Sequence, residues 1–130
     1  THNFKNSGGG TFKLALFTSS ATLGASTTAY ATTNEVSGTG YTTGGNTLNN
    51  PVVANQTNVA TLTFDQTQWT SATFGAAFGA IYNNSSSDKL VVVLDFGGTK
   101  SCSNGTFTIT FPSTSSGTPA GTDSLISITS

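Results

Sequence analysis

The carboxylates are the side chains of this sequence best suited to acid–base chemistry, and two of them have matching surroundings. Asp65 and Asp95 each adjoin a phenylalanine at the end of an apolar, strand-like run. Two strand-end carboxylates that faced each other could serve as the acid and base of a glycosidase. Such residues more often accept hydrogen bonds from the amides of a turn. We therefore expect no enzymatic activity and keep a glycosidase that uses this pair as the alternative.

Histidine and cysteine occur once each, as His2 and Cys102, which limits nucleophilic and metal chemistry. A serine nucleophile needs a neighbouring base, and His2 lies in a segment expected to be a flexible arm. One His and one Cys far apart in the chain form no ligand cluster, and a single cysteine excludes an internal disulfide. Residues 94–105 lack the dense aspartates of a calcium loop. We expect no catalytic residue, no metal and no cofactor, and a partly buried thiol at Cys102.

The stretch NEVSGTGYTTGG, residues 34–45, holds four glycines among hydroxyl side chains and looks at first like a phosphate-binding loop. Such a loop needs a helix after it and usually a lysine at a set offset. Neither is indicated here, and Thr43 stands where the third glycine of the dinucleotide pattern would fall. Glycines that allow positive φ between strands are the simpler explanation. The stretch is therefore predicted to be a structural turn with Tyr41 as its packing anchor.

Aromatic side chains could support a different activity, which is stacking on the apolar face of a sugar. Trp69, with Tyr30, Tyr41 and Tyr82, could form such a platform on a sheet. A tryptophan that fills a sheet edge or a seam between subunits is the more common arrangement. Both interpretations stay open, and the residues expected to act as interaction or packing anchors are Tyr41, Trp69, Phe78 and Tyr82.

The composition indicates the fold class and excludes several partners. Charged residues make up 7% of the 130 residues, against about 25% in typical globular domains. The polarity comes from Thr, Ser, Asn and Gly instead, of which Thr favours strands and the others favour turns. Four lysines and no arginine cannot neutralise a run of phosphates, so nucleic acid is not an expected partner. No apolar run approaches about 20 residues, so no membrane-spanning helix is expected.

Apolar residues that recur at every second position predict the strands. In TFKLALFTSS, residues 11–20, both alternating faces are largely apolar, which predicts an interior strand. In QWTSATFGAAFGAIYNN, residues 68–84, the interior glycines disfavour a helix by about 1 kcal/mol each. We predict a strand there, with Gly75 and Gly79 packed closely against another layer or a neighbouring subunit. The side chains predicted on its other face are Phe74, Ala76, Phe78, Ala80 and Tyr82.

The later part of the chain continues the strand pattern. KLVVVLDF, residues 89–96, is nearly continuously apolar and β-branched, which predicts a strand buried on both faces. TFTITF alternates cleanly, with Phe107, Ile109 and Phe111 predicted inward. Residues 112–123 read as a polar loop before a short final strand. Earlier in the chain, Pro51 would confine its strand to an edge or a bulge.

Together these patterns predict seven or eight short strands separated by turns. The expected fold is all-β, a single-domain β-sandwich of the jelly-roll or immunoglobulin-like kind. Residues 1–10 are expected to form a flexible N-terminal arm, and residues 11–130 the sandwich domain.

Several stretches also carry a family resemblance. They are KLALFTSS, NEVSGTGYTTGGNTL, QWTSAT, AIY and LVVVLDFGGTKSCSNGTFTITF, within residues 12–111. In this order they resemble a family of small virion structural proteins of tailed phages. The Gly-Tyr block and the last block are the most specific parts of the match.

The resemblance implies a function without catalysis. A protein of this kind would decorate or cement the capsid surface by packing its sheets against capsomers. Its expected location is the virion, its expected partners are the major capsid protein or other virion proteins, and we expect a homo-oligomer. The alternatives are a tail or fibre component and a host-glycan-binding module.

Overall fold

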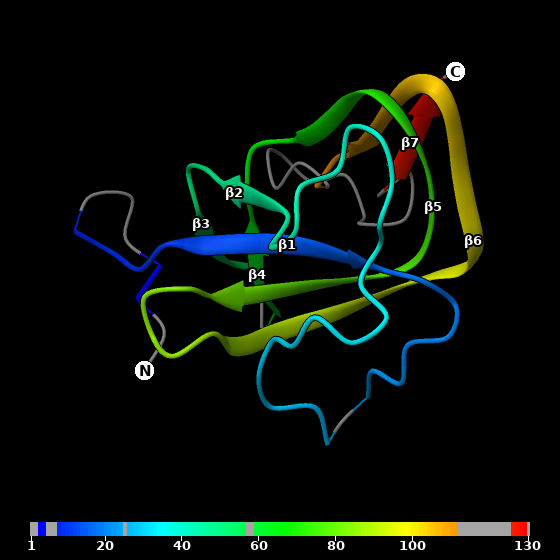
Figure 1. Cartoon of the computed structure of the whole chain (residues 1–130). Helices are drawn as coiled ribbons and strands as arrows, with labels where there is room; N and C mark the ends of the chain where they lie inside the picture. The colour runs from blue at the N-terminus through cyan, green and yellow to red at the C-terminus, as the bar shows by residue number, and fades with distance from the viewer. Residues whose placement is uncertain (1–2, 5–7, 25, 57–58, 112–125, 130) are drawn as a thin grey trace.

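The computed structural model describes residues 3–4, 8–24, 26–56, 59–111 and 126–129. Within residues 53–61 and 126–129 it describes the backbone alone. The strands pair antiparallel, and the described residues contain no helix, which confirms the predicted all-β class. Five strands form one sheet in the order β2-β1-β5-β6-β7, and two more form a separate hairpin (Figure 1). The strands are β1 (Phe12–Phe17), β2 (Asn46–Leu48), β3 (Val52–Gln56), β4 (Val59–Thr63), β5 (Thr67–Asn83), β6 (Lys89–Ile109) and β7 (Ile126–Thr129).

Strand β1 lies inside the sheet, as its sequence pattern predicts. It pairs with β2 on one side and with β5 on the other. Phe12, Leu14 and Leu16 pack into a first core cluster, while Ala15 and Phe17 pack into a second cluster on the opposite face. A strand that is apolar on both faces is therefore buried on both faces.

Strands β5 and β6 form a hairpin far longer than the short strands predicted. β5 has 17 residues and β6 has 21, whereas about 5–6 is usual. Four register shifts interrupt their pairing, and irregularities of this kind bend a strand and increase its twist. β5 runs beside β1 with β6 on its other side, and both then turn sharply, so that the sheet curls around the first core cluster (Figure 1).

The largest register shift corrects the predicted faces of β5. Ala76 lies opposite Lys100, but Phe78, only two residues later, lies opposite Asp95. Residues 96–99 of β6 are thus left over against a single residue of β5, and a bulge moves the following side chains to the other face. The prediction of one continuous face was wrong. Of its five residues, Phe74 and Ala76 belong to the first cluster, whereas the second cluster takes Phe78, Ala80 and Tyr82.

The glycines of β5 pack closely, but against the adjacent strands of the same sheet and not against the separate layer that was predicted. A Cβ atom on Gly79 would lie 3.1 Å from the Phe96 ring and 3.2 Å from the Leu14 side chain. Further along β6, Phe107 and Ile109 are 0% exposed, which confirms that they point inward. Phe111 is partly buried against the same cluster.

Strand β2 bridges the two ends of the curled sheet. It pairs with β1, and the side-chain amide of Asn46 also donates hydrogen bonds to the Thr67 hydroxyl and the Gln68 carbonyl of β5, both at 3.0 Å. The three-residue strand β2 thus links β1, with which it pairs, to the start of β5 through the side-chain amide of Asn46.

The start of β6 corrects a second prediction. Residues 89–96 were expected to be buried on both faces, yet only Phe96 among them is buried, and Val92 is 39% exposed. The reason is the strand order, because β7 pairs only with residues 106–109 of β6. The apolar run is therefore at an edge of the sheet and not in its interior.

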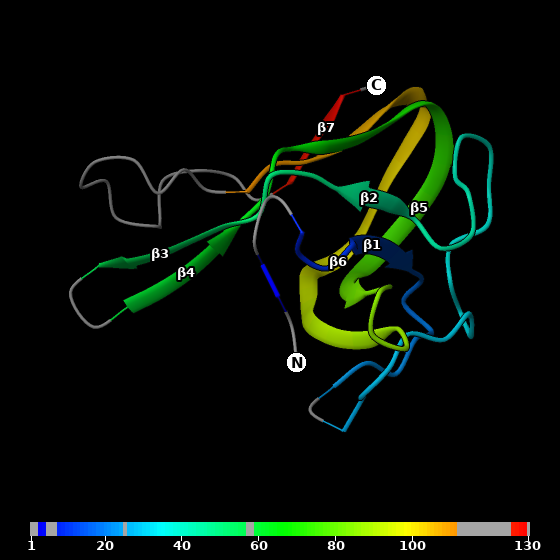
Figure 2. The ribbon, with the colours of Figure 1, turned by 90° about the vertical axis from the view of Figure 1, so that its left-hand side faces the viewer.

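The β3–β4 hairpin stands away from the curled sheet (Figure 2). Its strands pair with each other from Val52 opposite Thr63 to Gln56 opposite Val59, and neither pairs with another strand of the described structure. Pro51 directly precedes β3, in a hairpin that has two open edges. The sandwich of two packed sheets is not confirmed by this arrangement.

The two ends of the chain are described in part. Strand β7 confirms the short final strand, and the predicted loop at residues 112–123 lies outside the described residues. Within the predicted arm, the ring of Phe4 stacks on Phe12 with centroids 4.6 Å apart. The Gly10 amide donates to the Asn3 carbonyl at 2.7 Å. The division into arm and domain stays a prediction.

Candidate interaction surface

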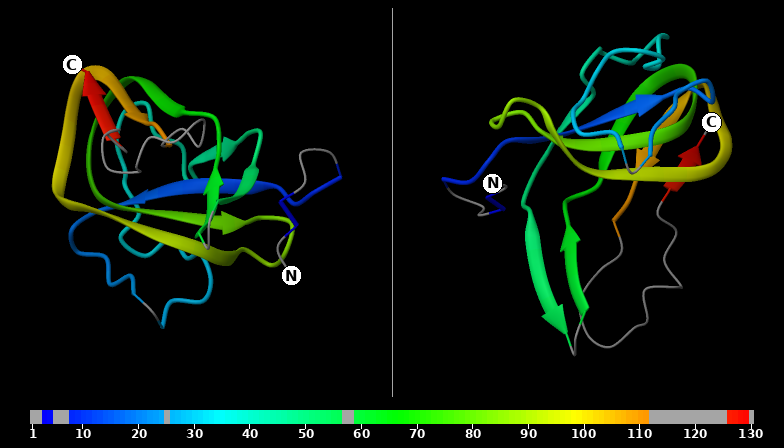
Figure 3. Two further views of the ribbon diagram at one scale, coloured as in Figure 1. Left: turned by 180° about the vertical axis from the view of Figure 1, so that it is seen from behind. Right: turned by 90° about the horizontal axis from the view of Figure 1, so that it is seen from below.

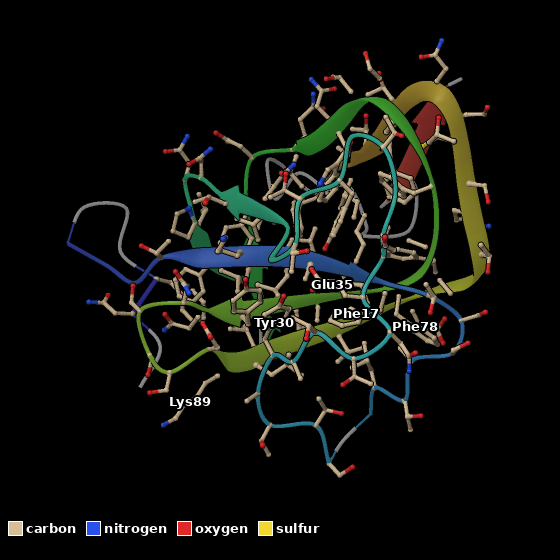
Figure 4. The ribbon with its side chains drawn as sticks, viewed as in Figure 1. Phe17, Tyr30, Glu35, Phe78 and Lys89 are labelled. Carbon is tan, nitrogen blue, oxygen red and sulfur yellow. The ribbon has the colours of Figure 1, made fainter. Side chains whose placement is uncertain are left out.

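Glu35 holds the glycine-rich stretch together. Its carboxylate accepts hydrogen bonds from the hydroxyls of Tyr30 (2.5 Å) and Tyr41 (2.6 Å) and from the backbone amide of Gly44 (2.7 Å). The Tyr41 hydroxyl in turn accepts a hydrogen bond from the Leu16 amide of β1 at 3.0 Å. Figure 4 shows Tyr30 and Glu35 together in front of the sheet. One carboxylate therefore ties three points of the loop to one another and, through Tyr41, to the sheet.

This network keeps the tyrosine hydroxyls protonated. Burial is the largest cause that raises the pKa of Tyr30 and Tyr41 far above the ordinary value of 10.0, and the hydrogen bond to Glu35 is the second. Burial also raises the pKa of Tyr82 to about 12, with smaller contributions from the charges of Asp88 and Glu35. The hydroxyls thus act as hydrogen-bond donors and not as bases or nucleophiles.

Tyr82 extends the network into the second core cluster. Its hydroxyl donates to the Gly44 carbonyl at 2.8 Å, and its ring stacks on Tyr30 with centroids 4.3 Å apart and planes 8° from parallel. The side chain is 2% exposed. Phe78 is partly buried in the same cluster, near Phe17 (Figure 4). Tyr82 is therefore a packing residue that fastens the loop to β5.

Two glycines let the stretch lie directly on the sheet. Gly45 has φ of 75°, and a Cβ atom there would lie 1.8 Å from the Leu14 carbonyl oxygen. A Cβ atom on Gly38 would lie 2.6 Å from the Thr73 carbonyl oxygen. Close approach of two backbones accounts for these glycines without a phosphate ligand.

Trp69 is enclosed and offers no ring face to a sugar. It is 3% exposed, and its ring lies 6.0 Å from Tyr41, 6.0 Å from Phe107 and 6.3 Å from Phe74, measured between centroids. Its indole N–H has no hydrogen-bond partner among the described residues. Of the two roles predicted for Trp69 and Tyr41, the contacts are those of packing within the core.

The carboxylates considered for catalysis have local partners. Asp65 accepts a hydrogen bond from the side-chain amide of Asn50, and Asp95 accepts one from the backbone amide of Gly97 at 2.9 Å. Both are exposed. Each therefore has the role of a turn residue, which is the more common arrangement for a carboxylate at a strand end.

The described residues contain no cluster of three or more His, Cys, Asp or Glu that could hold a metal ion. Cys102 lies in β6, is 5% exposed, and has its thiol sulfur 3.8 Å from the Phe74 carbonyl oxygen. It is a buried packing residue. In the part of the chain that the structure describes, no helix is long and apolar enough to cross a membrane.

Two parts of the backbone with exposed apolar side chains lack a strand partner among the described residues, and they are the candidate interaction surface. One is the outer edge of β6 at residues 91–95, beyond the pairing of Ala29 with Lys89. The other is the β3–β4 hairpin, where Val52 is 47% exposed. These edges include the two large hydrophobic side chains that are most exposed in the described structure, Val52 and Val92.

Sequence reasoning missed Glu35 as the organising residue of the loop. A signal was present, because Glu35 is the only charged residue between Lys13 and Asp65 and has tyrosines on both sides in sequence. The comparisons with known proteins add no assignment, since the chain matches no protein-family model, no curated protein and no solved structure.

Proposed function

We propose that this chain is a phage virion structural protein that decorates or cements the capsid surface. It would act by packing strands against the major capsid protein or other virion proteins. The observation that carries the proposal is the contrast between the interior and the edges. Aromatic and aliphatic side chains pack against one another inside, whereas the exposed Val92 of β6 and Val52 of the β3–β4 hairpin lie on edges with no strand partner among the described residues.

The location of the acids supports a role without catalysis. Glu35 is committed to three hydrogen bonds, and Asp65 and Asp95 are committed to their own turns. Tyrosines with raised pKa offer no base. We therefore propose no enzymatic activity, no cofactor and no nucleic-acid partner for this protein.

For the fold, we keep a sandwich-like interpretation of the bent sheet. The long β5–β6 hairpin bends sharply. Asn46 of β2, the strand beside β1, donates a hydrogen bond to Gln68 near the start of β5 and so holds this part of the bent hairpin. A closed core of this kind gives a rigid body that can bridge neighbouring capsomers. Several modest contacts that link different capsomers strengthen one another, because the second contact forms at a high effective concentration.

The test measures particle stability. Virions stripped of this protein, and the same virions after the purified protein is added back, are heated while DNA release is followed with an intercalating dye. We expect stripped particles to release DNA at a lower temperature, and added protein to restore the original temperature. Equal release temperatures in all samples would contradict the proposal.

Copy number separates the capsid from the tail. Quantitative mass spectrometry of purified virions should give a number on the order of the capsomer count if the protein lies on the capsid lattice. A number that matches only the vertex or the tail symmetry would favour the tail or fibre alternative. The glycan-binding alternative loses its main motivation, because the ring of Trp69 is buried.

A further inference from the structure

The β3–β4 hairpin lacks the neighbours that a hairpin usually needs. Two strands alone are marginally stable in water, and a third strand or a packed layer is required for independent stability. Here β3 and β4 pair with each other and with no other strand of the described structure, and only the Leu62 side chain among their described side chains packs against the first core cluster. Two hydrogen bonds fix the base of the hairpin. The backbone amide of Asp65 donates to the Asn49 carbonyl, and the side-chain amide of Asn50 donates to the Asp65 carboxylate. Both outer edges of the hairpin therefore have no strand partner within residues 3–4, 8–24, 26–56, 59–111 and 126–129.

The hairpin also lacks the usual protection of an open edge. Natural proteins guard such edges with charged side chains, above all lysine, or with proline within the strand. Residues 51–64 contain no charged residue, and the one proline, Pro51, precedes β3. A strand pair that is uncharged along its whole length is suited to pairing with another chain.

The complementary edge lies on β6. Residues 92–95 pair with β5 on one side, from Ile81 to Phe78. On the other side, the loop pairs only as far as Leu90, whose amide donates to the Thr28 carbonyl, and β7 pairs only from Thr106 onward. The right-hand view of Figure 3 shows this part of β6 at the border of the sheet, with the hairpin projecting from the body.

The surroundings of the β6 edge leave room for a further strand. A groove of about 390 Å³ runs along residues 90–93 and is bounded on its other side by Gly24 and Thr27. Small residues on that side limit steric obstruction. Lys89, the charged residue at the start of β6, points away from the sheet (Figure 4).

We propose that the β3–β4 hairpin of one copy adds to the open β6 edge of a second copy and continues its sheet. A second copy is the occupant that the molecule itself indicates, because every chain carries both a hairpin and a β6 edge that have no strand partner among the residues the structure describes. The hairpin strands have five residues each, one more than the regular run at residues 92–95. Val92, Val93 and Leu94 are uncharged, and the one charged residue of the run, Asp95, stands at its end, where its carboxylate accepts a hydrogen bond from the Gly97 amide.

The contact joins two different surfaces, so it is head-to-tail. Such a contact leaves one hairpin and one edge unused at the ends of each assembly, and it builds rings or open chains. This inference does not depend on the virion role, since it concerns the purified protein alone.

The test uses lysine substitutions at the exposed position of each surface. Val92→Lys places a charge on the β6 edge, and Val52→Lys places one on the hairpin, while Val92→Thr and Val52→Thr are β-branched, uncharged controls. Sedimentation velocity over a wide concentration range should show wild-type protein and both Thr variants assembling. Each Lys variant should associate at least about tenfold more weakly. Unchanged Trp69 fluorescence establishes that the variants are folded.

Mixing the two Lys variants gives the decisive measurement. Val92→Lys keeps an intact hairpin and Val52→Lys keeps an intact edge, so the mixture should form a dimer and stop there. Hydrogen exchange should show backbone amides of residues 92–95 becoming protected as concentration rises. A wild-type protein that stays monomeric, lysine variants that assemble normally, or a mixture that does not dimerise would each overturn the inference.

Discussion

Replacing Glu35 with glutamine should destabilise the protein by about 2–3 kcal/mol, because three donors converge on this carboxylate. Hydrogen bonds to a charged acceptor contribute about 1.5–3 kcal/mol each, against about 1 kcal/mol for neutral pairs. Glutamine keeps one oxygen, which can still accept from Tyr41 and Gly44. Its amide group cannot accept from Tyr30 and can only donate to the hydroxyl oxygen, so the Tyr30 hydroxyl proton loses its charged acceptor. The partly exposed position of Glu35 keeps the expected loss below the sum of three charged bonds.

Urea unfolding followed by fluorescence is the assay, since Trp69 is the only tryptophan and is buried. The midpoint should fall while the slope with denaturant stays the same, which marks a change of stability without a change of the unfolded state. Tyr30→Phe is the matched control, because it removes only one of the three bonds. In a double-mutant cycle, Glu35→Gln and Tyr30→Phe should be coupled by about 1 kcal/mol or more. A loss below about 0.5 kcal/mol, or additive effects of the two changes, would refute the role given to Glu35.

Two further predictions concern the same loop. Gly45→Ala should destabilise by about 3 kcal/mol or more through a Cβ 1.8 Å from the Leu14 carbonyl oxygen and a positive φ. Gly24→Ala, with open space around it, should change the urea midpoint little, and equal effects would contradict the steric argument. The buried tyrosines should make the protein less stable in alkali, because their pKa in the folded state lies above the unfolded value of 10.0. Their contribution to the free energy of unfolding is complete below pH 10. It falls as the pH rises through about 12 for Tyr82, and at higher pH for Tyr30 and Tyr41. Unfolding measured in urea across this range should show a weaker decline in Tyr41→Phe, and an unchanged decline would contradict it.

The strands were predictable where side-chain period alone decides the structure. β1 is apolar at every second position on both faces, and it lies between two strands. The segment from Phe74 to Tyr82 was recognised as a strand despite its alanines, because interior glycines disfavour a helix. Phe107 and Ile109 point inward as their alternation indicates.

The faces of β5 were not predictable, because they depend on the partner strand. Ala76 and Phe78 would share a face in a regular strand, but four residues of β6 lie opposite the single residue between them. Nothing in the sequence of β5 records this bulge. Gly97 and Gly98 in β6, with φ of 75° and 142°, are the only local sign of it.

The exposure of β6 has the same kind of cause. A continuous apolar run fits a strand buried on both faces, and it also fits an edge that awaits a further strand. Strand order decides between these cases, and strand order is a property of the whole chain. The role of Glu35 depends likewise on Tyr30 and Tyr41 converging from different parts of one loop.

The low charge of the chain affects how it would find its partners. With four lysines and five acids among 130 residues, no strong field steers an approaching molecule, so association would begin from ordinary diffusional encounters. Backbone pairing along an uncharged edge is also little affected by salt, because screening acts mainly on exposed charges. A contact of this kind forms slowly but persists through changes of ionic strength. That property is the one that the proposed role on a capsid surface requires.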